Sequence, residues 1–232
     1  MVLINGYANI GSVRHGTTGE AIKDIFDIHF PNAGGVADLT WGKGGFWSKL
    51  GSSGLPPNYI QVIGLDIDVS GKAQIKSDYR LVPLQTQSVD VAVFDPPFIF
   101  TPGIRGLVGA KRFFLGSEAA TDGRFYSGSK SDSRILAPRN AEDLRVQTLL
   151  VMIEMRRIAR MGCILKGQNL ITSKHPNWWT YQVIDHGHKL WGLEPEDELI
   201  QISPAARMVD PRWKRQYHFR RHHAYYLVYK WD

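Results

Sequence analysis

Short apolar runs that end in acidic residues or glycines alternate with amphipathic segments along the chain, and this alternation most constrains the fold. The runs at 34–40, 61–68 and 88–94 have the length and the apolar content of buried strands. Strands separated by helices favour a mainly parallel sheet with helices on both faces, so we expect an α/β fold. Further strands are expected at 163–168, 196–202 and 224–230.

Several segments between these runs are expected to be helical. Residues 17–30 carry apolar side chains at helical spacing, and Thr17 or Thr18 can serve as the N-cap. Residues 141–161 have the strongest helical pattern, because Asn140 can cap the segment, acids occupy its first turn and basic residues its last turn. The other expected helices are a short one at 46–50 and one at 177–190.

A glycine-rich loop, Asp38-Leu39-Thr40-Trp41-Gly42-Lys43-Gly44-Gly45, follows the first apolar run. In parallel α/β sheets, ligands bind where loops leave the carboxyl ends of the strands. Glycines at such a place let the backbone turn sharply and approach a ligand closely. The loop lacks the Gly-Lys-Ser/Thr ending of a phosphate-binding P-loop, and taken alone it is equally compatible with a plain tight turn.

An acidic residue ends the second apolar run, at Asp66 in the sequence Gly64-Leu65-Asp66-Ile67-Asp68. An acid at the end of the second strand of a dinucleotide-type fold accepts hydrogen bonds from ribose hydroxyls. Asp66 lies at the spacing this role needs, roughly 20 residues past the glycine loop. A carboxylate at a strand end that is merely hydrated is the alternative.

The third apolar run leads directly into Asp95-Pro96-Pro97-Phe98. Two consecutive prolines restrict the backbone and carry no N–H group, so the Asp95 carboxylate and the Pro96 carbonyl become fixed acceptors. An amino group on a nucleobase offers two N–H donors, which two fixed acceptors would match. Phe98 adds a ring on which a base can stack. A structural Pro-Pro turn is the alternative interpretation.

In this order and spacing, the three segments resemble the class I S-adenosyl-L-methionine (SAM)-dependent amino-methyltransferases that act on nucleic-acid bases. In that family, Asp/Asn-Pro-Pro-aromatic is the catalytic signature. The resemblance implies a Rossmann-like methyltransferase fold with SAM as cofactor. It also implies a single domain spanning 1–232, with a mobile target-recognition insertion at about 99–140.

The resemblance further implies a role for particular residues. The catalytic residues would be Asp95, Pro96, Pro97 and Phe98. Asp66 would hold the ribose of SAM, and Asp78 would reach its adenine amino group. The full set of implied cofactor-binding residues is Thr17, Thr18, Asp38, Thr40, Gly42, Gly44, Asp66, Ile67, Asp78 and Asp95.

The charge of the chain favours a polyanionic partner. The net charge is +6 and the basic residues gather in 103–139 and 207–230, which suits nucleic acid. By resemblance to phage and restriction-type enzymes, we expect adenine N6 in DNA as the target. Methylation of RNA, at adenine N6 or guanine N2, stays open. Two other classes are a nicotinamide-dependent oxidoreductase and a non-catalytic nucleic-acid-binding module.

Other features narrow the class of protein. Cys163 is the only cysteine, so an intrachain disulfide is excluded, and we expect this thiol to be packed in the core. We expect no metal, because the histidines at 218, 222 and 223 have no cysteine or carboxylate cluster beside them. Trp178 and Trp179 are expected in the core. No apolar run reaches 18 residues, so we expect a protein without membrane contact in the cytoplasm of a bacterial or phage-infected cell; its oligomeric state is open.

Overall fold

The computed structural model of the protein describes residues 3–4, 7–8, 10–42, 44, 46–47, 60–67, 69, 72–96, 138, 140–172, 175–202 and 222–231. Pro97, Phe98, Asp68 and nearly all of the expected insertion at 99–140 lie outside these residues. The same holds for the second basic stretch up to residue 221 and for most of the expected helix at 46–50.

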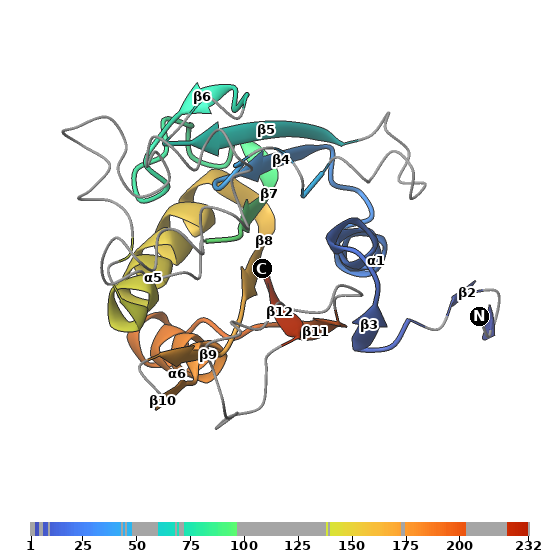
Figure 1. Ribbon diagram of the computed structural model, residues 1–232. Helices are drawn as coiled ribbons and strands as arrows, with labels where there is room; N and C mark the ends of the chain where they lie inside the picture. The colour runs from blue at the N-terminus through green and yellow to red at the C-terminus, as the bar shows by residue number, and fades with distance from the viewer. Residues whose placement is uncertain are drawn as a thin grey trace.

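An eight-stranded sheet runs through the molecule in the order β3-β11-β12-β8-β7-β4-β5-β6 (Figure 1). Neighbouring strands are parallel throughout, except that β12 is antiparallel to both β8 and β11. The strands are β3 (Val13–His15), β4 (Gly35–Asp38), β5 (Gln61–Asp66), β6 (Ile75–Lys76), β7 (Val89–Phe94), β8 (Ala159–Gly167), β11 (Asp197–Ile202) and β12 (His223–Lys230). The expected mostly parallel sheet is thus confirmed.

Two short antiparallel strand pairs lie outside this sheet. One pairs β1 (Leu3–Ile4) with β2 (Tyr7–Ala8), and the other pairs β9 (Leu170–Thr172) with β10 (His175–Asn177). The sequence patterns did not predict these pairs, nor the short edge strands β3 and β6. All are two or three residues long, too short for an alternation of apolar and polar residues to be visible.

Helices cover both faces of the large sheet. Figure 1 shows α1 (Thr18–His29) on one side, and α5 (Ala141–Ile158) and α6 (Trp179–Trp191) on the other. The core on the α1 face includes Ile22, Phe26, Val91, Ile164 and Tyr226. The core on the opposite face includes Phe94, Leu144, Met152, Cys163, Leu165 and Trp179. Cys163 is fully buried, as expected.

Helix α5 begins as predicted but ends earlier. The Asn140 side chain accepts a hydrogen bond from the Asp143 amide, so the expected N-cap is confirmed. The helix ends at Ile158, whereas the sequence pattern predicted residue 161. The reason is tertiary: Ala159 already pairs with Val89 of the neighbouring strand. Pairing within the sheet therefore takes over a segment whose own pattern favours helix.

The two tryptophans at the start of α6 have different environments. Trp179 is fully buried, but Trp178 is 51% exposed, so the expectation that both lie in the core is wrong for Trp178. Trp178 is the N-cap residue, and successive residues of a helix point about 100° apart. Two adjacent large side chains at a helix start therefore cannot both face the same core.

Within the part of the chain that the structure describes, no helix combines the length and the apolar character needed to cross a membrane.

The order of the strands changes direction at β4. The chain leaves β4 to add β5 and β6 on one side, then returns to add β7 and β8 on the other. In open α/β sheets, the crevice outside the carboxyl ends of the strands at such a switch point is where ligands bind. Here that position is flanked by Asp38, the last residue of β4, and by Asp95, which follows β7.

Candidate active site

A row of polar side chains crosses the sheet near the carboxyl ends of its parallel strands. Each member lies two positions beyond a buried apolar residue of the α1 face, and because side chains alternate along a strand, both point to the same face. The pairs are Val36 and Asp38, Val93 and Asp95, Ile164 and Lys166, and Leu199 and Gln201. Strand pairing aligns Lys166 with Tyr226, which joins the row from β12.

Asp38 is almost completely buried, with 2% of its surface exposed. One carboxylate oxygen accepts a hydrogen bond from the Thr40 amide at 2.9 Å, and the other accepts from the indole N–H of Trp47 at 2.6 Å. Burial raises the pKa of Asp38 to about 7, although these two hydrogen bonds oppose the rise. Asp38 therefore titrates near neutral pH and organises the loop that follows β4.

Thr40 connects this loop to the corner after β7. Its hydroxyl oxygen accepts a hydrogen bond from the backbone amide of Asp95 at 2.8 Å. Beside it, the Leu39 amide donates to the Val93 carbonyl at 2.9 Å. The backbone of the Asp95-Pro96 corner is thus held from the neighbouring strand, so its position does not depend on the prolines alone.

Asp95 forms an ion pair with Lys166 of β8. The Lys166 ammonium donates to Oδ2 of Asp95 at 2.8 Å, and the two side chains are only 17% and 27% exposed, respectively. Pro96 is buried beside them. The carboxylate of the Asp-Pro-Pro motif is therefore fixed and partly shielded from water at the switch point of the sheet.

The glycine loop reaches back to β5. The amide of Gly42 donates to Oδ2 of Asp66 at 2.7 Å, so this carboxylate supports the loop. Gly42 and Gly44 have φ angles of +54° and +68°, in the left-handed region that strains residues with a Cβ atom. A Cβ atom at Gly44 would also come within 2.7 Å of the Trp41 ring. Both glycines thus have a conformational reason for their place in the loop.

Asp78 lies at the far end of the predicted cofactor set, after β6. Arg80 binds both carboxylate oxygens of Asp78, with an ion-pair distance of 2.7 Å. If Asp78 binds the adenine amino group as predicted, its carboxylate must bind that group and the Arg80 guanidinium at the same time. This role of Asp78 stays a prediction. Ile67 is half-buried directly after β5.

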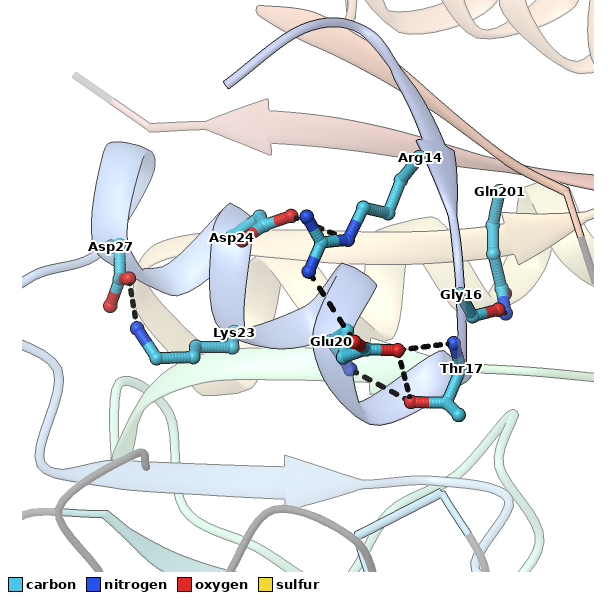
Figure 2. A network of polar contacts seen from close by, with 8 residues as sticks. All are labelled: Arg14, Gly16, Thr17, Glu20, Lys23, Asp24, Asp27 and Gln201. Atoms are coloured by element: carbon cyan, nitrogen blue, oxygen red, sulfur yellow. Dashed lines mark hydrogen bonds and ion pairs between the residues drawn. The ribbon is translucent and has the colours of Figure 1, made fainter. Parts of the chain in front are cut away.

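The start of α1 is fixed by a polar network, shown in Figure 2. The Thr17 hydroxyl accepts from the Glu20 amide while the Glu20 carboxylate accepts from the Thr17 amide, so Thr17 is the N-cap. The Gln201 side chain donates to the Gly16 carbonyl at 2.8 Å. The Thr17 hydroxyl is thus used to cap the helix. The predicted contact of Thr17 with the cofactor stays a prediction.

Thr18 and Tyr226 link this helix start to the polar row. The buried Tyr226 hydroxyl donates to Gln201 at 2.7 Å and is hydrogen-bonded to the Thr18 side chain. Burial raises the pKa of Tyr226 to about 12, which keeps the hydroxyl neutral and able to donate. The structure thus connects Thr18 to the sheet edge that also carries Asp95.

Sequence reasoning missed Lys166, Tyr226 and Trp47 as parts of the site. A signal for Lys166 was present, because Lys interrupts the otherwise apolar run of β8 and is rarely buried without a partner. Trp47 and Tyr226 gave no comparable signal, since buried aromatic residues are ordinary core residues.

The acceptor-rich edge suits a ligand that carries positive charge and hydroxyl donors. Asp38, Asp66 and Asp95 gather near the switch point, and the charges of Asp66 and Asp95 act on Asp38. Among the described residues, no group of three or more His, Cys, Asp or Glu side chains lies close enough to hold a metal ion.

Comparisons with known proteins return similar folds at low identity. No family model matches the sequence, and no curated protein matches it. A protein from Pyrococcus horikoshii, PH0226, is 15% identical with a TM-score of 0.46, and the match covers 91% of this chain and 88% of that one. A SAM-dependent methyltransferase from Aquifex aeolicus is 12% identical with a TM-score of 0.42, over 91% and 88% of the two chains.

A third structure is similar to the same extent. The methyltransferase domain of the bacterial protein CtHen1-CN is 12% identical with a TM-score of 0.44, and the match covers 92% of this chain and 97% of that domain. Such identities and TM-scores do not identify the activity of this chain, which must be inferred from its own residues.

Proposed function

We propose that this protein is a SAM-dependent methyltransferase that methylates an exocyclic amino group of a nucleic-acid base, with adenine N6 in DNA as the first candidate. The observation that carries the proposal is the Asp95-Pro96 corner. It lies at the switch point of a parallel sheet, with its backbone held by Thr40 and its carboxylate by Lys166. A fixed carboxylate beside a proline carbonyl at that place is what an amino group with two N–H donors requires.

The residues at the ends of β4 and β5 fit the proposed cofactor. The cofactor would supply an electrophilic methyl group on a positively charged sulfur. The Asp66 carboxylate at the end of β5 offers hydrogen-bond acceptors on that side of the switch point, and Asp38 at the end of β4 adds negative charge there once it loses its proton near pH 7. Gly42 and Gly44 leave the backbone of the intervening loop without side chains, which allows close approach of a ligand.

At the corner, Asp95 and the Pro96 carbonyl would accept the two N–H bonds of the target amine. This orients the nitrogen lone pair toward the methyl carbon. The bound cofactor would supply the methyl group, and the electron pair of its C–S bond would leave with sulfur as the new N–C bond forms. The methylated nitrogen then carries an extra proton, which the Asp95 carboxylate accepts and passes to water. The protein accelerates this direct displacement by positioning and by electrostatics, without a covalent enzyme intermediate.

The chain's charge supports a nucleic-acid target. The net charge of +6 favours a polyanion, and a base inside a duplex must leave the stack to reach a corner of this kind. Phe98 as a stacking surface and 99–140 as the recognition segment remain parts of the proposal that lie outside the described residues. The sequence resemblance favours DNA over RNA as the substrate, so RNA methylation is the second candidate.

The proposal is tested by transfer of a labelled methyl group from SAM to DNA and to RNA, followed by nucleoside analysis of the product. From DNA we expect N6-methyldeoxyadenosine. Asp95→Ala removes the acceptor oxygens of the side chain, so it should lower transfer at least about 100-fold, a loss typical of removing a key electrostatic group. SAM binding, measured by calorimetry, should change little. Full activity of Asp95→Ala would refute the mechanism.

Calorimetry also separates the other classes. An oxidoreductase would bind a nicotinamide dinucleotide in preference to SAM. A non-catalytic nucleic-acid-binding module would bind DNA without heat from either cofactor. The half-buried, fixed carboxylate of Asp95 argues against the binding module, because such a module has no need for a lysine-bound carboxylate at a sheet edge.

A further inference from the structure

Lys166 stands out as a buried cation that neither the sequence patterns nor the proposed mechanism required. It lies on β8, in the polar row, with its ammonium 2.8 Å from Oδ2 of Asp95. Among the described residues, no other side chain donates a hydrogen bond to this carboxylate. Lysine is rarely enclosed to this degree unless a specific interaction holds it there.

The surroundings of Lys166 come from separate elements. The ammonium lies over the ring of Phe46, 5.2 Å from its centroid, and over the ring of Tyr226, 5.9 Å from its centroid. Both distances are within the range of cation–π attraction. Burial lowers the pKa of Lys166, but the charge of Asp95 and the hydrogen bond to it outweigh burial, so the pKa is raised. The side chain therefore remains a cation.

The walls of this enclosure are fixed in turn. Tyr226 pairs with Lys166 across β12 and β8, and its hydroxyl is held by Gln201, which also binds the Gly16 carbonyl. Figure 2 shows this last contact at the start of α1. The Lys166 ammonium is thus placed by β8, β12 and the neighbouring β11, so its position over Asp95 is not left to a flexible side chain.

We propose that Lys166 is a positioning residue for methyl transfer: it holds one oxygen of Asp95 in place, so that the other oxygen is presented to the target amine. The inference rests on the proposed function. A carboxylate has two acceptor oxygens, so one can accept from the ammonium while the other accepts from the amine.

The test compares three substitutions at this position. Lys166→Gln keeps a hydrogen-bond donor but removes the charge, Lys166→Met removes both, and Lys166→Arg keeps the cation. For each we would measure kcat and KM for methyl transfer between pH 5.5 and 9, together with SAM binding. Lys230→Gln, at the exposed end of the adjacent strand β12, is the matched control that also removes one positive charge.

We expect kcat to fall by about tenfold to 100-fold in Lys166→Gln and Lys166→Met, since a small misplacement of a positioning group can cost about 100-fold. SAM affinity and KM should stay within a few-fold, and Lys166→Arg should retain most of kcat. Lys230→Gln should behave as the wild type.

A second measurement needs no activity. The carbon-13 carboxyl signal of Asp95 should change its chemical shift in Lys166→Gln, because the contact with the ammonium is lost, and should stay near the wild-type position in Lys166→Arg. An active enzyme whose kcat is unchanged in Lys166→Gln and Lys166→Met would overturn the positioning role and leave the proposed function intact. Absence of methyl transfer by the wild-type protein to DNA and RNA would instead overturn the proposed function, and the positioning role with it.

Discussion

Replacing Asp38 by Asn should remove a pH dependence of stability that the wild-type protein shows between pH 4 and 7. In the folded chain, burial raises the pKa of Asp38 to about 7 from an ordinary value of 3.8. Between these two values the unfolded chain has released the proton while the folded chain still holds it. Stability from this group is therefore complete below pH 3.8 and is lost as the pH rises to about 7.

The size of the effect follows from linkage between folding and proton binding. With pKa values of 3.8 and about 7, the free energy of unfolding should fall by about 2–3 kcal/mol between pH 5 and pH 8 from this group alone. Asp38→Asn cannot ionise, so it should lack this decrease. It should also lose about 1–3 kcal/mol at every pH, because the amide nitrogen cannot accept the hydrogen bond from Trp47.

Urea denaturation at pH 5, 6.5 and 8 at constant ionic strength measures both effects. Asp90→Asn is a useful control of opposite sign. Burial raises the pKa of Asp90, but hydrogen bonds from Arg160, Gly35 and Gly34 outweigh burial, so the pKa is lowered. Its contribution is lost only as the pH falls below the ordinary range, so Asp90→Asn should leave the slope between pH 5 and 8 unchanged. Identical slopes for wild type and Asp38→Asn would refute the reasoning.

Three further predictions concern the fold. Glu154→Ala should lower the free energy of unfolding by about 2–4 kcal/mol in urea titrations, because it leaves the buried Val82 amide without its acceptor; a loss below 1 kcal/mol would contradict this. Gly167→Ala should give little soluble folded protein by circular dichroism, since its Cβ atom would lie 1.7 Å from the buried Trp179 ring. Cys163 is fully buried, which raises the pKa of its thiol, so a thiol reagent should label it only at the rate of unfolding; rapid labelling of folded protein would be inconsistent with the core.

Much of the fold was accessible from the sequence because its strands are buried on both faces. The runs at 61–66 and 89–94 are nearly continuous stretches of apolar residues, and their polar ends lie at one edge of the sheet as predicted. The end of α5 was not accessible, because residues 159–161 continue a helical pattern. Only pairing with β7, a strand some 70 residues earlier in the chain, makes that segment a strand.

The candidate site was accessible in part. Asp38, Thr40 and Asp95 were predicted from motifs, and the structure brings them together through hydrogen bonds. Lys166 could not be assigned to Asp95 from the sequence, because their contact depends on the register of β7 against β8. That register aligns Phe94 with Leu165, and so places the next residue of each strand side by side.

The polar row connects residues that are far apart in the chain, and this bears on how the proposed site is held in place. Two hydrogen bonds lead from Gly16 through Gln201 to Tyr226, the Tyr226 ring lies under the Lys166 ammonium, and an ion pair joins Lys166 to Asp95. A carboxylate used for positioning must keep its place within a fraction of an ångström, which supporting contacts beyond it provide. The start of α1 therefore does more than cover the core. By fixing Gln201 and Tyr226 it limits the movement of the lysine, and through the lysine it limits the movement of Asp95.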